Sequence, residues 1–112
     1  MISLIAKVVA HFRVNKIQKT YTKAIKIQDD ILLRLIKKAA NTKFGRDHKF
    51  TTISNYEDFK KMVPIRDYES IKKYVRDIEK GKENILWPGK PKYLAKTSGT
   101  TSGVKLIPIT KE

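Results

Sequence analysis

The chain has no cysteine and only two histidines, His11 and His48. Without thiols it can form neither a disulfide framework nor a thiolate metal site. The two histidines stand far apart in the sequence, and neither has an acidic partner at the spacing that metal ligands show. We therefore predict no metal site, and we expect both histidines to lie at the surface.

Long hydrophobic runs are also missing. No apolar stretch approaches the ~20 residues that a membrane-spanning helix requires. The apolar start of the chain, residues 1–12, is too short and too interrupted to be the apolar core of a secretory signal, so we interpret it as mature sequence. Together with the absence of cysteine, this indicates a soluble, cytoplasmic protein.

Acidic residues are scarce. Lys and Arg number 25 against 11 Asp and Glu, which gives a formal net charge of +14, and residues 1–50 carry twelve of the bases but three of the acids. A basic region of this kind can bind nucleic acid or an anionic membrane. However, the lysines are spread at one or two per helical turn, as on a solvated helix face, and no aromatic-and-arginine stacking motif accompanies them. Neither nucleic acid nor a membrane is the expected partner, although a stand-alone basic helical module that binds one of them remains an alternative.

The first part of the chain predicts two long helices, because apolar residues return at three- and four-residue steps. The apolar stripe of the first helix consists of Leu4, Ile5, Val8, Val9, Phe12, Ile17, Tyr21, Ala24 and Ile25. Packing on the next helix is its expected role, and lying at a membrane interface is the alternative. We expect the second helix to begin near Asp29 and Asp30, which suit a helix N-terminus, and to be broken by Asn41 and Gly45. The two helices are expected to form an antiparallel pair.

Two shorter helices are predicted in residues 46–92. Ser54-Asn55-Tyr56-Glu57 fits a capping box and begins a helix that runs to about Met62, before Pro64. Asp67 is expected to cap the next helix, which Gly81 stops. The apolar face of that helix consists of Ile71, Tyr74, Val75 and Ile78. Trp87 follows in a loop, where we interpret it as a packing anchor rather than a ligand contact.

The end of the chain predicts two short strands, residues 93–97 and 105–110, with Pro108 at an edge position or a bulge. The fold class is thus an α+β fragment: two long and two shorter helices, followed by a short β-hairpin. By organisation, residues 1–45 form a helical pair, 46–92 short helices and loops, and 93–112 a strand-loop-strand segment.

The loop of this hairpin is rich in hydroxyl groups and glycine: Thr97-Ser98-Gly99-Thr100-Thr101-Ser102-Gly103-Val104-Lys105. Glycines let several backbone N–H groups converge on one anion, hydroxyls add donors, and a lysine adds positive charge. The spacing matches neither a Walker A loop nor G-x-G-x-x-G. An ordinary polar hairpin turn is the alternative, but such turns usually carry Asn or Asp. The composition therefore favours a phosphate-binding loop.

Residues 98–103, followed by Lys105, resemble the nucleotide-binding loop of the adenylate-forming enzymes. Three more segments recur in the same order in one branch, the Gretchen-Hagen (auxin-responsive) acyl-acid-amido synthetases, in particular their bacterial relatives. These segments are Asn41-Thr42-Lys43-Phe44-Gly45-Arg46, Phe59 through Met62-Val63-Pro64-Ile65-Arg66-Asp67-Tyr68-Glu69, and Asn84-Ile85-Leu86-Trp87-Pro88-Gly89. The resemblance is good from about Lys26 to Thr110.

The resemblance implies an ATP-dependent ligase with Mg²⁺, which activates a carboxylic acid as an acyl-adenylate and transfers it to an amine or amino acid. It implies that the ATP phosphates are bound by Thr97, Ser98, Gly99, Thr100, Thr101, Ser102, Gly103 and Lys105, and it assigns no catalytic residue within the chain. Family members are several times longer than these 112 residues. The resemblance therefore implies the N-terminal part of a larger α/β adenylation domain, which is not a complete catalyst by itself. Its partners would be ATP, a carboxylic acid and the remainder of the enzyme, in the same or a separate chain. An inactive remnant that needs a partner chain is a further alternative.

Overall fold

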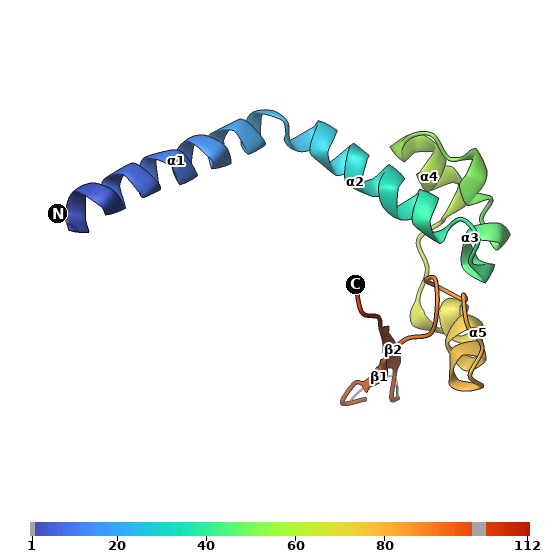
Figure 1. The fold of residues 1–112 in the computed structure, drawn as a ribbon. Helices are drawn as coiled ribbons and strands as arrows, with labels where there is room; N and C mark the ends of the chain where they lie inside the picture. The colour runs from blue at the N-terminus through green and yellow to red at the C-terminus, as the bar shows by residue number, and fades with distance from the viewer. Residues whose placement is uncertain (1, 100–102) are drawn as a thin grey trace. The chain divides into compact units, whose positions relative to one another are not determined.

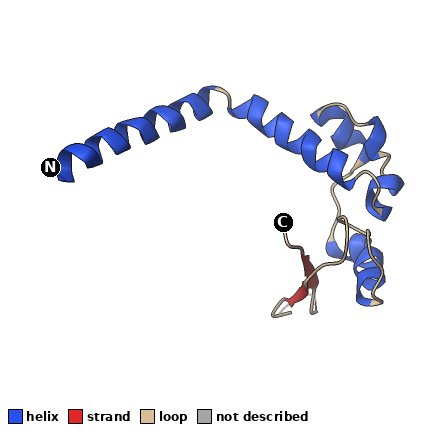
Figure 2. Cartoon of the chain, viewed as in Figure 1, coloured by secondary structure: helices blue, strands red, loops and turns tan. Residues whose placement is uncertain are grey.

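The computed structural model describes residues 2–99 and 103–112, with helices first and a β-hairpin last (Figure 1, Figure 2). The elements are α1 (Ile2–Thr22), α2 (Ala24–Ala39), α3 (Lys43–Asp47), the 3₁₀ helix η1 (Phe50–Thr52), α4 (Tyr56–Met62), α5 (Tyr68–Glu79), β1 (Tyr93–Lys96) and β2 (Leu106–Ile109). This order confirms a helical fragment that ends in a β-hairpin, whereas α3 and η1 were not predicted. The chain divides into two compact units, a first that ends at Leu32 and a second that runs from Leu33 to Glu112.

The first unit contains α1 and the beginning of α2, and the junction between these helices lies at Lys23. The expected start of the second helix at Asp29 and Asp30 is wrong, because both aspartates lie inside α2. Two threonines near the end of α1 account for the position of the junction at Lys23. The hydroxyl of Thr20 donates to the carbonyl of Lys16 at 2.9 Å, and that of Thr22 to the carbonyl of Lys19 at 3.0 Å. Threonine bonds of this kind compete with regular helix hydrogen bonding and often bend a helix.

The apolar side chains of α1 are exposed. Leu4, Ile5 and Phe12 expose 69%, 66% and 70% of their surface. Within the described residues 2–32, the expected packing of the two helices as an antiparallel pair is therefore not found. A single residue joins α1 to α2, which is too short a connection for the chain to reverse. No helix among the described residues is long and apolar enough to cross a bilayer.

The second unit holds the hydrophobic core. Tyr74 and Ile78 from α5 pack with Ile85 from the following loop, and all three are buried. Partly buried residues surround this cluster: Phe44, Ile71, Leu86 and Leu94. Burying one such side chain fully contributes roughly 1.5–3 kcal/mol. The predicted apolar face of α5 is therefore the face that builds the core.

Gly45 lies inside helix α3 and does not simply break the preceding helix as predicted. Thr42 caps α3, because its hydroxyl accepts a hydrogen bond from the N–H of Gly45 at 2.9 Å. A Cβ atom at Gly45 would lie 2.1 Å from the carbonyl oxygen of Ala39. Only glycine allows the two backbone segments to approach this closely.

His48 is buried, at 5% exposure, so its expected surface position is wrong. Its ring stacks on that of Phe44, with centroids 3.9 Å apart, and its Nδ1 lies 2.7 Å from the carbonyl oxygen of Phe44. The stack adds His48 to the aromatic part of the core. His11, in contrast, is exposed as expected.

Both shorter predicted helices are present, with caps that differ in detail. Asn55 caps α4 by accepting from the N–H of Asp58 at 2.9 Å, and Asp58 in turn accepts from the N–H of Ser54 at 3.1 Å. The reciprocal partner is thus Asp58, and not Glu57 as the capping box predicted. Asp67 caps α5 as predicted, by accepting from the N–H of Ser70 at 2.9 Å.

Strands β1 and β2 pair antiparallel, with Tyr93 opposite Ile109 and Lys96 opposite Leu106. They form a two-stranded sheet, so each strand is an edge strand. The N–H of Leu106 points away from β1, to a side chain of α5, and Pro108 shares that outward side two residues on. The missing N–H of Pro108 therefore removes no bond from the ladder, which agrees with the predicted edge position.

Candidate functional site

The loop between β1 and β2 is closed by two hydrogen bonds at its base. The N–H of Thr97 donates to the carbonyl of Lys105 at 3.0 Å, and the N–H of Lys105 donates to the hydroxyl oxygen of Thr97, also at 3.0 Å. The Thr97 hydroxyl thus acts as an acceptor that fixes the loop, and its own proton remains available to donate. This pair holds the two ends of the candidate loop together.

Two glycines give the loop its backbone path. Gly99 has a φ of +59° and Gly103 a φ of +77°, values that residues other than glycine rarely adopt. A Cβ at Gly99 would lie 3.0 Å from the backbone carbon of Gly103 and 3.0 Å from the backbone nitrogen of Val104. The backbone therefore folds closely across itself at this point, which explains both glycines.

The second strand is fastened to helix α5 just after the loop. The N–H of Leu106 donates to the Tyr68 hydroxyl at 2.9 Å, and that hydroxyl faces the Leu106 carbonyl at 3.4 Å. The ammonium of Lys105 lies over the Tyr68 ring, 5.8 Å from its centroid, a position that allows a cation–π interaction. Tyr68 thus holds both the strand and the lysine, a role that the sequence reasoning missed. Two signals could have pointed to it: its position as the first residue of α5, after a predicted cap, and its place in one of the segments that resemble the family.

Lys105 forms no ion pair within residues 2–99 and 103–112. Its charge is one of the smaller influences that lower the pKa of Asp67, after the hydrogen bonds from the hydroxyl and N–H of Ser70. The lysine is half-buried beside Tyr68, and no carboxylate of the described residues contacts its ammonium. It can therefore attract an anion that enters the loop.

The described part of the predicted set is brought together at one end of the hairpin. Thr97, Ser98, Gly99, Gly103 and Lys105 belong to this turn, and Ser98 and Gly103 are exposed. The predicted residues Thr100, Thr101 and Ser102 lie outside the described residues. In chemical terms the turn offers hydroxyl groups, a glycine backbone and one cation, all suited to an anion.

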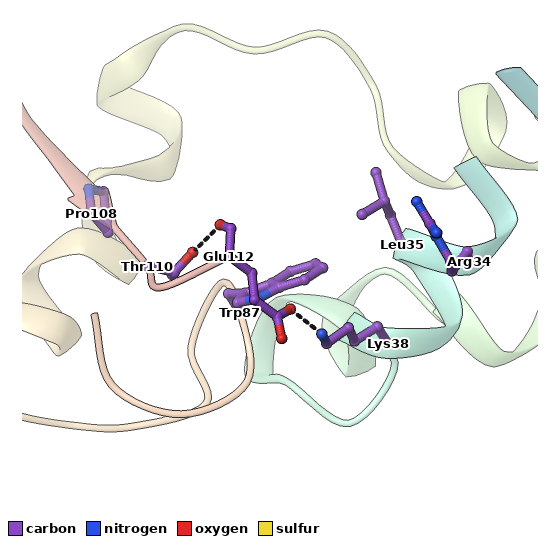
Figure 3. A pocket seen from close by; sticks show the side chains of 7 residues that line it. All are labelled: Arg34, Leu35, Lys38, Trp87, Pro108, Thr110 and Glu112. Atoms are coloured by element: carbon purple, nitrogen blue, oxygen red, sulfur yellow. Dashed lines mark hydrogen bonds and ion pairs between the residues drawn. The ribbon is translucent and has the colours of Figure 1, made fainter. Parts of the chain in front are cut away.

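The second unit also contains a hollow with Trp87 on its wall (Figure 3). Its volume is about 620 Å³, and it is lined by Arg34, Leu35, Lys38, Trp87, Pro108, Thr110 and Glu112. The Lys38 ammonium forms an ion pair with Glu112 and lies 5.6 Å from the centroid of the Trp87 ring. Trp87 is half-buried, so it packs only in part as the predicted anchor. Lys38 and Trp87 are too far apart in the sequence for their spacing to have revealed this hollow.

Asp77 is the most strongly perturbed acid among the described residues. It accepts from the ammonium groups of Lys43 and Lys82, each at 2.7 Å, and these bonds lower its pKa to about 2. The contact with Lys43 joins α5 to α3, so the role of Asp77 is structural. The described residues contain no group of three acidic or histidine side chains arranged to hold a metal ion.

Comparison with known proteins shows the family. The GH3 family N-terminal domain matches residues 13–112. The chain is 36% identical over 93 residues to indole-3-acetic acid-amido synthetase GH3.15 of Arabidopsis thaliana, an alignment that covers 81% of this chain and 16% of that protein. No solved structure matches the chain. The chain belongs to the GH3 family, and it spans about a sixth of the length of this curated relative.

Proposed function

We propose that the chain is the N-terminal part of an ATP-dependent acyl-acid-amido synthetase. Such an enzyme condenses a carboxylic acid with ATP to an acyl-adenylate, releases pyrophosphate, and passes the acyl group to an amine or amino acid. The family match over residues 13–112 carries this proposal, since the relative described above is named for an amido synthetase activity. We place the chain in the adenylate-forming superfamily, and in its bacterial GH3 branch, on the ordered segments of the sequence.

We assign the binding of the ATP phosphates to the loop of residues 97–105. The chemical difficulty of the first step is charge, because a carboxylate must attack a phosphorus atom surrounded by anionic oxygens. Donors that are held in place before the reaction offset this repulsion and stabilise the charge that develops on pyrophosphate. Three features support the assignment: the closed base at Thr97, the folded glycine backbone, and the Lys105 ammonium, which has no ion-pair partner among the described residues.

The side chains of the loop also suit a nucleotide that carries Mg²⁺. Mg²⁺ is usually bound through one or two carboxylates together with the phosphates of the nucleotide. The described residues of the loop carry hydroxyls and no carboxylate, so they fit the phosphate oxygens and not the ion itself. When bound, Mg²⁺ would supply charge neutralisation between phosphates, while Thr97, Ser98 and Lys105 would orient the anionic chain.

The acyl substrate and the amine would be selected by the remainder of the enzyme, in the same or a separate chain. The proposed location is the cytoplasm, where ATP is available. We expect the protein isolated from its source to exchange labelled pyrophosphate into ATP when a suitable carboxylic acid is present. Exchange that needs no acid, or ATP hydrolysis without exchange, would contradict acyl-adenylate formation.

A further inference from the structure

The first turns of α1 present an apolar face that nothing in the described first unit covers. Leu4, Val8 and Phe12 follow one another at intervals of four residues, and Ile5 and Val9 lie one position further on. At 3.6 residues per turn these five side chains fall on one side of the helix. They expose between 47% and 70% of their surface. Figure 1 shows this part of α1 as a regular helix.

The charges around this face all have one sign. No Asp or Glu precedes Asp29, whereas six basic residues do: Lys7, Arg13, Lys16, Lys19, Lys23 and Lys26. By helical geometry Lys7 and Arg13 flank the apolar face, one on each side. Long basic side chains in such positions can bury their stems while the charged ends reach polar groups at the rim. The first turns of α1 therefore carry an exposed apolar face that is flanked by basic side chains.

The family domain does not account for this face. The match to the GH3 N-terminal domain begins at Arg13, so all five apolar residues precede it. The part of α2 that belongs to the first unit, residues 24–32, does not cover them either, as their exposure shows. A second copy of the chain would bring two strongly cationic segments together, which is unfavourable for a protein of net charge +14.

We propose that residues 2–14 of α1 bind the surface of an anionic lipid bilayer. The apolar face enters the boundary between headgroups and acyl chains, and Lys7 and Arg13 contact lipid phosphates. Weak apolar insertion and electrostatic attraction act together, a combination that gives stable but reversible binding. The inference goes beyond the proposed ligase activity, because it places the protein at a membrane surface whatever reaction it catalyses.

The test is sedimentation of the full chain with lipid vesicles of two compositions. One set contains phosphatidylcholine alone, and the other phosphatidylcholine mixed with phosphatidylglycerol. We expect binding to the anionic vesicles, little binding to the neutral ones, and a loss of binding as salt is raised, because screening weakens the attraction. Absence of binding to the anionic vesicles would overturn the proposal.

Two matched variants separate the apolar contribution from the charge. Phe12→Ser removes an aromatic side chain from the face, and Ala10→Ser places the same residue on the opposite side of the helix. We expect Phe12→Ser to weaken vesicle binding about tenfold, the effect of losing most of one buried aromatic side chain, and Ala10→Ser to leave it unchanged. Equal binding by both variants would show that the contact with the bilayer is purely electrostatic. It would overturn the proposed insertion of the apolar face into the bilayer.

Two further measurements distinguish membrane insertion from a loss of helix and from dimer formation. Circular dichroism of both variants shows whether helix content is retained, and Val8→Ser provides a second change on the same face with a smaller expected loss, because valine buries less apolar area than phenylalanine. Analytical ultracentrifugation without lipid tests for a dimer. A dimer of the unchanged chain that Phe12→Ser dissociates would assign the face to a second copy and would contradict the membrane proposal.

Discussion

Removal of the Tyr68 hydroxyl should loosen strand β2 next to the candidate loop. In Tyr68→Phe, the N–H of Leu106 loses the acceptor that lies 2.9 Å away, while the ring under Lys105 remains. Leu106 is partly buried, so water replaces this bond incompletely. A donor left without its partner in such a position costs about 1–2 kcal/mol.

This cost corresponds to a roughly 5- to 30-fold change in an equilibrium constant, and amide hydrogen exchange can measure it at one residue. We expect the Leu106 amide of Tyr68→Phe to exchange about 5–30 times faster than that of the unchanged chain. Tyr93→Phe is the matched control, because Tyr93 lies on β1, is 68% exposed, and its hydroxyl makes no hydrogen bond to the described residues. The same exchange rate of Leu106 in both variants would refute the role given to Tyr68.

Two other predictions concern the frame that carries the hairpin. Gly45→Ala should lower the free energy of unfolding in urea by about 1–3 kcal/mol or more, because its Cβ would lie 2.1 Å from the Ala39 carbonyl oxygen; an unchanged urea midpoint would disprove this close approach. Asp77 has a folded-state pKa of about 2, below its ordinary value of 3.8, so its ion pairs stabilise the fold above about pH 4 and this stabilisation is lost as the pH falls toward 2. Urea midpoints measured from about pH 5 to about pH 2 should therefore fall more steeply in the unchanged chain than in Asp77→Asn, and parallel curves would contradict the assignment.

The helices whose ends are marked by capping residues or glycine close in the sequence could be predicted. Asp67 at the start of α5 and Gly81 after its end act through neighbouring residues, so the predicted helix and its buried face are found. The hairpin was predictable for the same reason, because strand residues flank a glycine-containing turn. The start of α2 was not, because it follows the threonine bonds at the end of α1, and the favourable effect of Asp29 and Asp30 at a helix N-terminus is small.

Features that depend on distant contacts could not be predicted. The need for glycine at position 45 arises from the carbonyl of Ala39, and burial of His48 arises from its stack on Phe44. The hollow beside Trp87 likewise requires α2 to meet the end of the chain. For the candidate site, the residue types predict an anion-binding loop, which stays a prediction, whereas the support by Tyr68 required the fold.

The central claim is that the loop of residues 97–105 binds the ATP phosphates, and pyrophosphate exchange into ATP tests it most directly. The measurement compares two variants of the protein as isolated, Thr101→Ala within the loop and Thr52→Ala outside it, in the presence of a carboxylic acid that supports exchange. Thr52 is a suitable control because its exposed hydroxyl bonds only to the Lys49 carbonyl among the described residues. We predict that Thr101→Ala lowers exchange at least ~10-fold, the effect of removing one donor to developing charge, while Thr52→Ala does not. Equal exchange by the two variants would contradict phosphate binding by the loop.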